Sequence, residues 1–214
     1  MIATLRYTES WNSIPWTKCH RLVFRLQMRI YRAAHRGDFK RVHSLQRLLL
    51  RSWSARCLAA RQVSQDNRGK RTPGIDGIAS LTPKERCRFV DRLRDLVSKP
   101  DGIRRIFIPK PNGELRGLGI PTLFDRARQA LVKLVLEPEW EALFEHNSYG
   151  FRPGRGVHDA IEAIFNFIRL KPKYVLDADI EKCFDKIAHS PLLSKLNTFP
   201  VLSRLIHGWL KAGI

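Results

Sequence analysis

The chain has 214 residues, of which 39 are Lys or Arg and 20 are Asp or Glu, and its formal net charge is +19. Such an excess of cations indicates a polyanionic partner, with nucleic acid first and an anionic membrane surface second. No run of 18 or more apolar residues occurs, so the sequence predicts no membrane-spanning helix. The length allows one or two domains with a buried core.

The cysteines at positions 19, 57, 87 and 183 lie far apart and form no C-x-x-C pair. They are typical of reduced thiols, and neither a zinc site nor a disulfide framework is expected. The N-terminus has no apolar signal segment. We therefore expect an intracellular protein, in the cytoplasm or in an organelle.

Residues 17–36 are predicted to form a helix, because apolar residues recur there at helical spacing. Beside the apolar face, arginines recur at intervals of four, four, three and four, namely Arg21, Arg25, Arg29, Arg32 and Arg36. The helix contains no acid, and like charges at these spacings repel one another. Phosphates would offset that repulsion, so we favour nucleic-acid contact over a solvated face or a membrane-surface helix.

A second helix is expected from Asp38, as its cap, to about residue 62. Residues 64–79 are rich in Gly, Pro and Asn, which predicts an exposed, mobile loop. Thr82-Pro83-Lys84-Glu85 has the pattern of a capping box, so a third helix is predicted to begin there and to end near residue 99.

The spacing of apolar residues is no longer helical at residues 103–121. These residues are predicted to form two strands joined by a tight turn around Asn112-Gly113. Lys110 and Arg116 flank the turn and can project towards one point, an arrangement that suits a triphosphate. Spacing alone does not separate this hypothesis from an ordinary basic hairpin, which is the simpler interpretation.

A long helix is predicted over residues 122–146, and a loop with three glycines, two arginines and two aromatics follows at residues 148–160. Glycine allows close backbone approach, Arg152 and Arg155 can meet phosphate, and aromatic rings can stack on a base. The alternative is a loop whose aromatic side chains enter the core. Another helix then runs to about residue 171.

Residues 174–187 read Y-V-L-D-A-D-I-E-K-C-F-D-K-I. The apolar run at its start is predicted to be a buried strand, and it meets three carboxylates within a few residues. An EF-hand is excluded, because Lys182 stands where the loop needs Gly and Ala188 stands where it needs an acid. Two interpretations stay open here: a Mg²⁺ site, or a strand end followed by an acid-capped helix. A last amphipathic helix is predicted over residues 191–211.

Three of these stretches, in this order and spacing, resemble consecutive motifs of group II intron-encoded reverse transcriptases (maturases). They are I-P-K-P-N-G-E-L-R-G-L-G-I-P, S-Y-G-F-R-P-G-R-G-V-H-D-A-I and V-L-D-A-D-I-E-K-C-F-D-K-I. The upstream W-x-x-I-P-W and T-P-G-I-D-G elements are similar to the N-terminal extension of the same proteins. The resemblance covers nearly the whole chain.

The resemblance implies an α+β fold: a mostly helical N-terminal and fingers region with a β-hairpin, followed by the first strand of a right-hand polymerase palm. The N-terminal extension would cover residues 1–99, the fingers residues 100–172, and a partial palm residues 173–214. The implied activity is RNA-directed DNA polymerisation with two Mg²⁺ ions. The implied partners are intron RNA, template–primer and deoxynucleoside triphosphates.

The resemblance also implies roles for single residues. Asp179 matches the first catalytic aspartate, a ligand to both Mg²⁺ ions, and the carbonyl of Ile180 would bind one of them. Phe184 matches the aromatic residue that crowds the 2′-OH of the incoming nucleotide. Lys110 and Arg116 match the basic pair that holds its triphosphate. The arginines of residues 17–36, with Arg152 and Arg155, would contact RNA.

One departure matters for activity, because the family's second aspartate pair lies in a Y-A-D-D motif and no such string occurs in this chain. A single carboxylate cannot hold two Mg²⁺ ions against water. We therefore expect a truncated polymerase that is inactive alone and that would need a C-terminal reverse transcriptase fragment. Residues 173–179 would then present an exposed edge and an uncovered apolar face. The alternative is a non-catalytic RNA-binding fragment, similar to a maturase that assists splicing.

Overall fold

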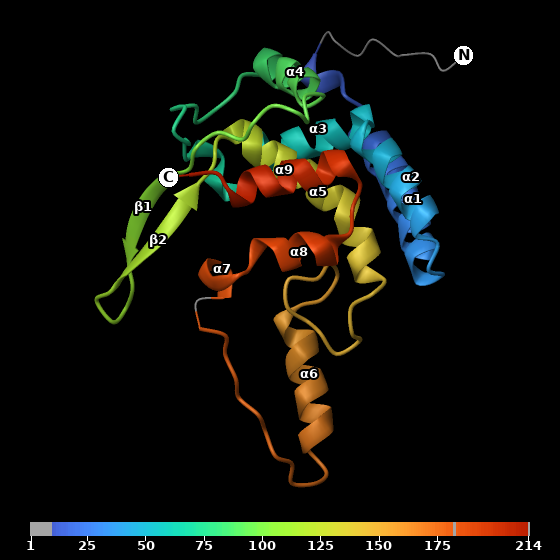
Figure 1. Ribbon diagram of the computed structural model, residues 1–214, viewed down its shortest axis with the longest axis vertical. Helices are drawn as coiled ribbons and strands as arrows, with labels where there is room; N and C mark the ends of the chain where they lie inside the picture. The colour runs from blue at the N-terminus through green and yellow to red at the C-terminus, as the bar shows by residue number, and fades with distance from the viewer. Residues whose placement is uncertain (1–9, 182, 214) are drawn as a thin grey trace.

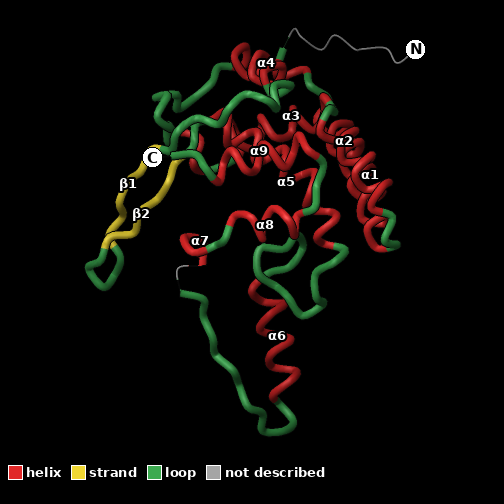
Figure 2. Tube along the Cα trace, in the orientation of Figure 1, coloured by secondary structure: helices red, strands yellow, loops and turns green. Residues whose placement is uncertain are grey.

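The computed structural model describes residues 10–181 and 183–213 and has a helical body from which two parts project (Figure 1). One projection is a β-hairpin, and the other is α6 with the loop that follows it (Figure 2). The predicted α+β class is confirmed. The helices are α1 (Trp16–His35), α2 (Phe39–Leu50), α3 (Trp53–Arg61), α4 (Pro83–Arg92), α5 (Leu123–Glu141), α6 (Val157–Ile168), α7 (Cys183–Lys186), α8 (His189–Leu196) and α9 (Pro200–Leu210).

The core lies where α1, α2, α3 and α5 pack on one another. Ile30 of α1, Leu49 of α2 and Leu131 of α5 are fully buried, because the apolar stripe of each amphipathic helix turns inward. Leu202 and Leu205 add α9 to the same cluster. No described helix is long and apolar enough to cross a membrane. The cysteines are free, and burial raises the pKa of the Cys57 thiol.

Two predicted helices are each divided in the structure. The helix expected over residues 38–62 begins with Asp38 as its cap, as predicted, but ends at Leu50, and Ser52 caps α3 by accepting from the amide of Ala55 at 3.5 Å. The helix expected over residues 191–211 is interrupted at Asn197, whose φ of 39° is left-handed, and α9 restarts with Pro200 in its first turn.

The capping box of α4 is confirmed: Thr82 N–H donates to Glu85 Oε2 at 2.7 Å, and Glu85 N–H donates to Thr82 Oγ1 at 3.4 Å. The helix nevertheless ends at Arg92, earlier than expected. The Asp95 carboxylate accepts from the amides of Val97 and Ser98, each at 3.0 Å, and this turn diverts the chain.

The loop at residues 64–79 is only partly as predicted. It contains a π-helical turn, η2 (Gln62–Asp66), and a 3₁₀ turn, η3 (Arg68–Arg71). Arg126 of α5 donates to the carbonyls of Gly69 and Thr72 at 2.9 and 2.7 Å. Gly74 is buried so close to α5 that a Cβ there would lie 2.7 Å from Thr122 Cα. These contacts fix the first part of the loop to the body.

The hairpin consists of β1 (Arg104–Pro109) and β2 (Leu115–Ile120), paired antiparallel with Ile108 opposite Arg116. Gly113 has a φ of 82°, which only glycine adopts readily, and Lys110 N–H donates to the Glu114 carbonyl at 2.7 Å. The turn around Asn112-Gly113 is therefore confirmed.

The strand predicted at residues 173–179 is wrong for this structure. The segment is irregular, and the side chains of Tyr174, Val175 and Leu176 are 80–107% exposed. Within the described residues, the hairpin is the only sheet. A strand requires a hydrogen-bonded neighbour, and the apolar run pairs with no strand among the described residues.

Candidate nucleic-acid interface and nucleotide site

The arginine row of α1 lies on the outer face of the body. Its members are all exposed: Arg21, Arg25, Arg29 and Arg32 on the helix, and Arg36 as its C-terminal cap. Within residues 10–181 and 183–213, none of them forms an ion pair. The opposite face of the helix is fixed to the core by buried Cys19, Val23 and Ile30. Five guanidinium groups are thus presented to solvent by a rigid element.

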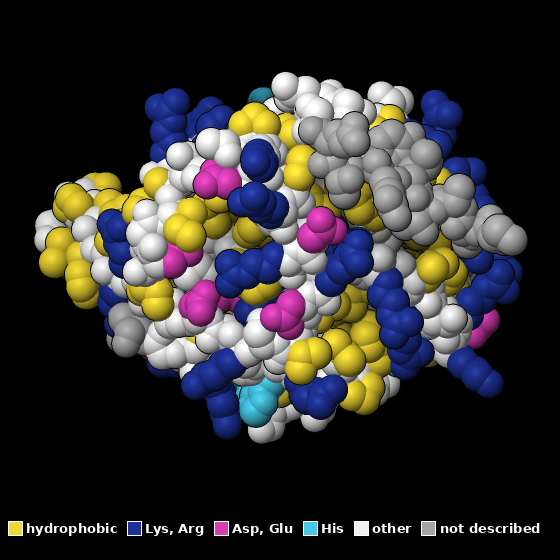
Figure 3. All heavy atoms as spheres, turned by 90° about the horizontal axis from the view of Figure 1, so that it is seen from above, with side chains coloured by type: hydrophobic (Ala, Val, Ile, Leu, Met, Phe, Trp, Pro, Cys, Tyr) yellow, Lys and Arg dark blue, Asp and Glu magenta, His cyan; other side chains and the backbone are white. Residues whose placement is uncertain are grey.

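Basic residues elsewhere on the first three helices differ in their availability. Lys40 and Arg41 on α2 and Arg51, which follows its last residue, are exposed. Arg56 of α3 is 7% exposed, and burial lowers its pKa. Arg61 lies 4.7 Å above the Trp16 ring. Sequence alone gives all of them the same charge. Figure 3 shows Lys and Arg side chains across the face seen from above as well as along its edges.

Lys110 and Arg116 project from the same face of the hairpin. Arg116 on β2 is paired with Ile108 on β1. Lys110 comes two residues after Ile108, just past the end of β1, so strand alternation places it on the same face as Ile108 and Arg116. The Lys110 ammonium donates to Glu114 Oε2 at 2.6 Å, and this hydrogen bond lowers the pKa of the Glu114 carboxyl. Arg116 is exposed and forms no ion pair with any described residue. An anion bound here would meet a free guanidinium and would compete with Glu114 for the lysine.

The base of this hairpin is held by a buried network that the sequence did not reveal. Asp125 of α5 accepts from the guanidinium of Arg128, from Asp101 N–H at 2.9 Å and from Trp209 Nε1–H at 3.1 Å. Thr122 donates to Asp101 Oδ2 at 3.1 Å. Asp101 precedes β1 and Thr122 follows β2, so the network fixes both ends of the hairpin to the body.

The described carboxylates near residue 179 lie apart from one another in their contacts. Asp179 is exposed, and its Oδ1 accepts from the Ile180 amide at 2.8 Å. Glu181 pairs instead with Lys186 at 2.9 Å. In the described part of the chain, no three His, Cys, Asp or Glu side chains lie close enough to share a metal ion. The side chains that the structure describes therefore do not by themselves form a site for two Mg²⁺ ions.

Two other predicted site residues near Asp179 are also exposed. Phe184 on α7 is 88% exposed and Ile180 is 71% exposed. No hydrogen bond or ion pair between described residues joins this segment to Lys110 or Arg116. The structure therefore keeps the hairpin pair and the Asp179 segment as two separate groups.

Arg152 differs most from its predicted role, because its side chain is buried. It forms a bidentate pair with Glu141 of α5 at 2.6 and 3.0 Å, and it also donates to the carbonyls of Glu145 and Ser148. This arginine anchors the glycine-rich loop to α5, so its geometry argues against contact with RNA. Arg155 donates to the His146 carbonyl and lies 5.3 Å from the Tyr149 ring centroid.

Comparison with known protein families finds two reverse transcriptase domains in this chain. Residues 11–93 match the N-terminal domain of reverse transcriptase, and residues 108–214 match reverse transcriptase (RNA-dependent DNA polymerase). Protein YkfC of Escherichia coli K12 is 36% identical over 163 residues, which cover 72% of this chain and 42% of YkfC.

Two further relatives are named for introns or maturases. Group II intron-encoded protein LtrA of Lactococcus lactis subsp. cremoris is 36% identical over 160 residues, covering 72% of this chain and 26% of LtrA. Maturase-like protein 1 of Euglena gracilis is 32% identical over 187 residues, covering 85% of this chain and 41% of that protein. The chain thus spans between about a quarter and two fifths of the length of these relatives. With matches to both domains, this chain belongs to the reverse transcriptase family.

Proposed function

We propose that the chain is the RNA-gripping and nucleotide-holding portion of an RNA-directed DNA polymerase of the group II intron type. The observation that carries this proposal is the row of five exposed arginines on α1, which have no ion pair in the described residues and no acid on their helix. Their partners would be the phosphates of intron RNA or of a template–primer. We further propose residues 1–99 as N-terminal extension, 100–172 as fingers and 173–214 as partial palm, in a cytoplasmic protein.

In the polymerase reaction, we propose that the hairpin pair Lys110 and Arg116 holds the triphosphate of a deoxynucleotide. Asp179 would supply one carboxylate for the Mg²⁺ ions, and Phe184 would lie beside the sugar. The described residues assemble no metal site, so we propose that these 214 residues alone do not extend a primer. Additional carboxylates would have to come from another polypeptide segment, such as a C-terminal reverse transcriptase fragment.

A second candidate function is an RNA-binding splicing cofactor without catalysis. The observation in its favour is that Asp179 is exposed and accepts only the amide of Ile180 among the described residues. A relative named as a maturase-like protein is consistent with it. In this case the arginine row would bind RNA and Asp179 would have no role.

Primer extension on an RNA template, with RNA retention on filters measured in the same samples, separates the two functions. We expect the chain alone to bind RNA without extending the primer. With a C-terminal fragment of a reverse transcriptase added, extension that is lost in Asp179→Ala but kept in Asp177→Ala would support the polymerase. Asp177 is the matched control, because it is an exposed aspartate two residues away. Extension by the chain alone would contradict the proposal that it lacks carboxylates.

A further inference from the structure

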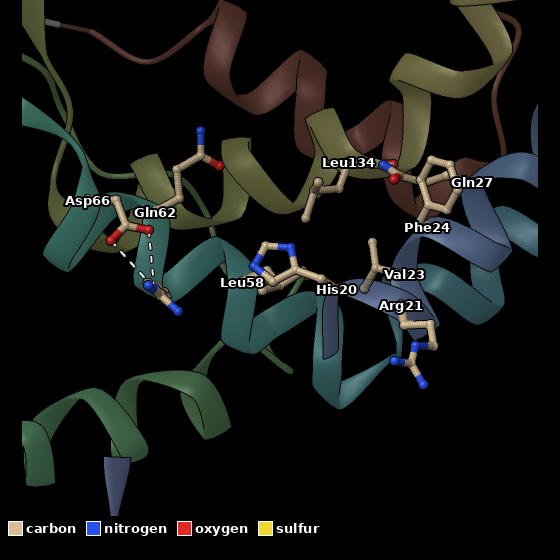
Figure 4. A pocket seen from close by; sticks show the side chains of 10 residues that line it. His20, Arg21, Val23, Phe24, Gln27, Leu58, Gln62, Asp66 and Leu134 are labelled. Atoms are coloured by element: carbon tan, nitrogen blue, oxygen red, sulfur yellow. Dashed lines mark hydrogen bonds and ion pairs between the residues drawn. The ribbon is translucent and has the colours of Figure 1, made fainter. Parts of the chain in front are cut away.

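A cleft of about 550 Å³ opens between α1, α3, η2 and α5 (Figure 4). Its volume lies in the range of about 300–1,000 Å³ that is typical of small-molecule sites. Val23 and Leu58, both largely buried, supply apolar lining, and His20, Arg21 and Phe24 come from α1. The cleft therefore combines apolar walls, two aromatic rings and the guanidinium groups of Arg21 and Arg61.

The Phe24 side chain is 62% exposed although a core lies directly beneath its helix. His20 precedes Phe24 by four residues, so the two rings lie on the same side of α1, one turn apart. Figure 4 shows both among the residues that line the cleft. An exposed aromatic ring in a cleft with apolar walls is a surface on which a flat, partly apolar group can stack.

The charges around the cleft restrict what that group can be. Arg21 lines the cleft and is also the first member of the arginine row, and it is exposed with no ion pair in the described residues. The acid that lines the cleft, Asp66, is already paired with Arg61 at 3.3 Å. Gln62 lies at the other end of the cleft from Phe24 and is exposed, and its side-chain amide makes no hydrogen bond with the described residues.

We propose that this cleft binds an unpaired RNA base, which stacks on Phe24 while its phosphate meets Arg21. The proposal rests on the proposed RNA binding by α1 and adds to it a site for a base that is out of the stack. A base has two π-faces, so it matches the Phe24 ring and the apolar wall of the cleft. Stacking of this kind tolerates any base, so the site recognises single-stranded or looped RNA and not one sequence.

The test compares Phe24→Ala with the matched control Phe167→Ala. Phe167 is 61% exposed on α6 and does not line the cleft. Loss of one stacked base should weaken binding to single-stranded RNA about fivefold to tenfold. Binding to a fully paired duplex and the dependence of affinity on salt should not change. Phe24→Trp should restore affinity, and RNA with 5-iodouridine should cross-link to Phe24 or His20.

The outcomes separate this proposal from the function on which it rests. If Phe24→Ala binds single-stranded RNA as tightly as the unmodified chain, while the arginine row is still needed, the cleft proposal is overturned and RNA binding stands. The cleft proposal is likewise overturned if Phe24→Ala weakens single-stranded and duplex RNA equally, or if Phe167→Ala has the same effect. If the unmodified chain does not bind RNA at all, both proposals fail.

Discussion

The hairpin that carries Lys110 and Arg116 should lose its fixed base when Asp125 is replaced by Ala. Asp125 is 1% exposed and Arg128 is fully buried. Without the carboxylate, the guanidinium keeps its hydrogen bonds to Ser98 at 2.8 and 3.0 Å, but it becomes a buried charge without its paired carboxylate. The amide of Asp101 and the indole of Trp209 lose their acceptor as well.

The expected cost follows from this geometry. Removal of one partner from a buried ion pair costs about 3–5 kcal/mol in the free energy of unfolding. The chain offers a matched comparison, because Asp91 and Arg94 form another aspartate–arginine pair at the same spacing, with N···O 3.3 Å and side chains 53% and 64% exposed. Asp91→Ala should cost less than about 1 kcal/mol, since solvent screens an exposed pair.

Urea unfolding of the two variants measures both costs. Amide hydrogen exchange then reports the hairpin separately, and Asp125→Ala should speed exchange at residues 104–120 more than Asp91→Ala does. If the two substitutions destabilise the protein equally, the argument from burial is wrong. If Asp125→Ala destabilises the body but leaves exchange in the hairpin unchanged, the network does not hold the hairpin.

Three further predictions test other buried contacts. Arg152→Ala should expose the 142–156 loop to limited proteolysis, because the arginine holds this loop to α5. RNA affinity should stay within about twofold, since the donors of Arg152 all face protein atoms. A large loss of RNA affinity would contradict this structural role. Burial raises the pKa of Glu139 above its ordinary value of 4.5. The contribution of this group to folding stability is therefore fully present below pH 4.5 and is lost as pH rises through the folded-state pKa. Glu139→Gln should therefore gain stability relative to the unmodified chain as pH rises from about 4.5, and urea midpoints that stay parallel from pH 4 to 7 would refute this. Gly74→Ala should lower the thermal midpoint by several degrees, since its Cβ would lie 2.7 Å from Thr122 Cα, whereas Gly150→Ala, which meets nothing within 4 Å, should not.

Local signals in the sequence predicted local structure correctly. Asp38 and the Thr82-Glu85 capping box act within one helical turn, and the Asn112-Gly113 turn needs only its own backbone angles. The breaks at Ser52 and Asn197 were missed, because apolar periodicity continues through each of them and hides the interruption. The strand at 174–176 was predicted from propensity, but a strand forms only where a neighbour accepts its hydrogen bonds.

The sequence predicted the candidate site only for residues whose exposure follows from helical spacing along one element. The arginines of α1 fall on one side of a strongly amphipathic helix, so their outward position could be read from spacing. Arg152 could not be assigned in the same way, since its partner Glu141 lies on another element. The network around Asp125 joins residues up to 84 positions apart, and no pattern in the sequence marks it.

The most direct test of RNA binding by α1 is the affinity for single-stranded RNA as a function of salt. We would compare the unmodified chain with the triple variant Arg21→Ala, Arg25→Ala and Arg29→Ala. The control is a triple variant of equal charge, in which three exposed residues on or just after α4, Lys84, Arg88 and Arg94, become Ala. If each α1 arginine meets one phosphate, the slope of log K against log salt should become shallower by about 2 in the first variant and hardly change in the control. An unchanged slope in the α1 variant, or equal changes in both, would contradict the account.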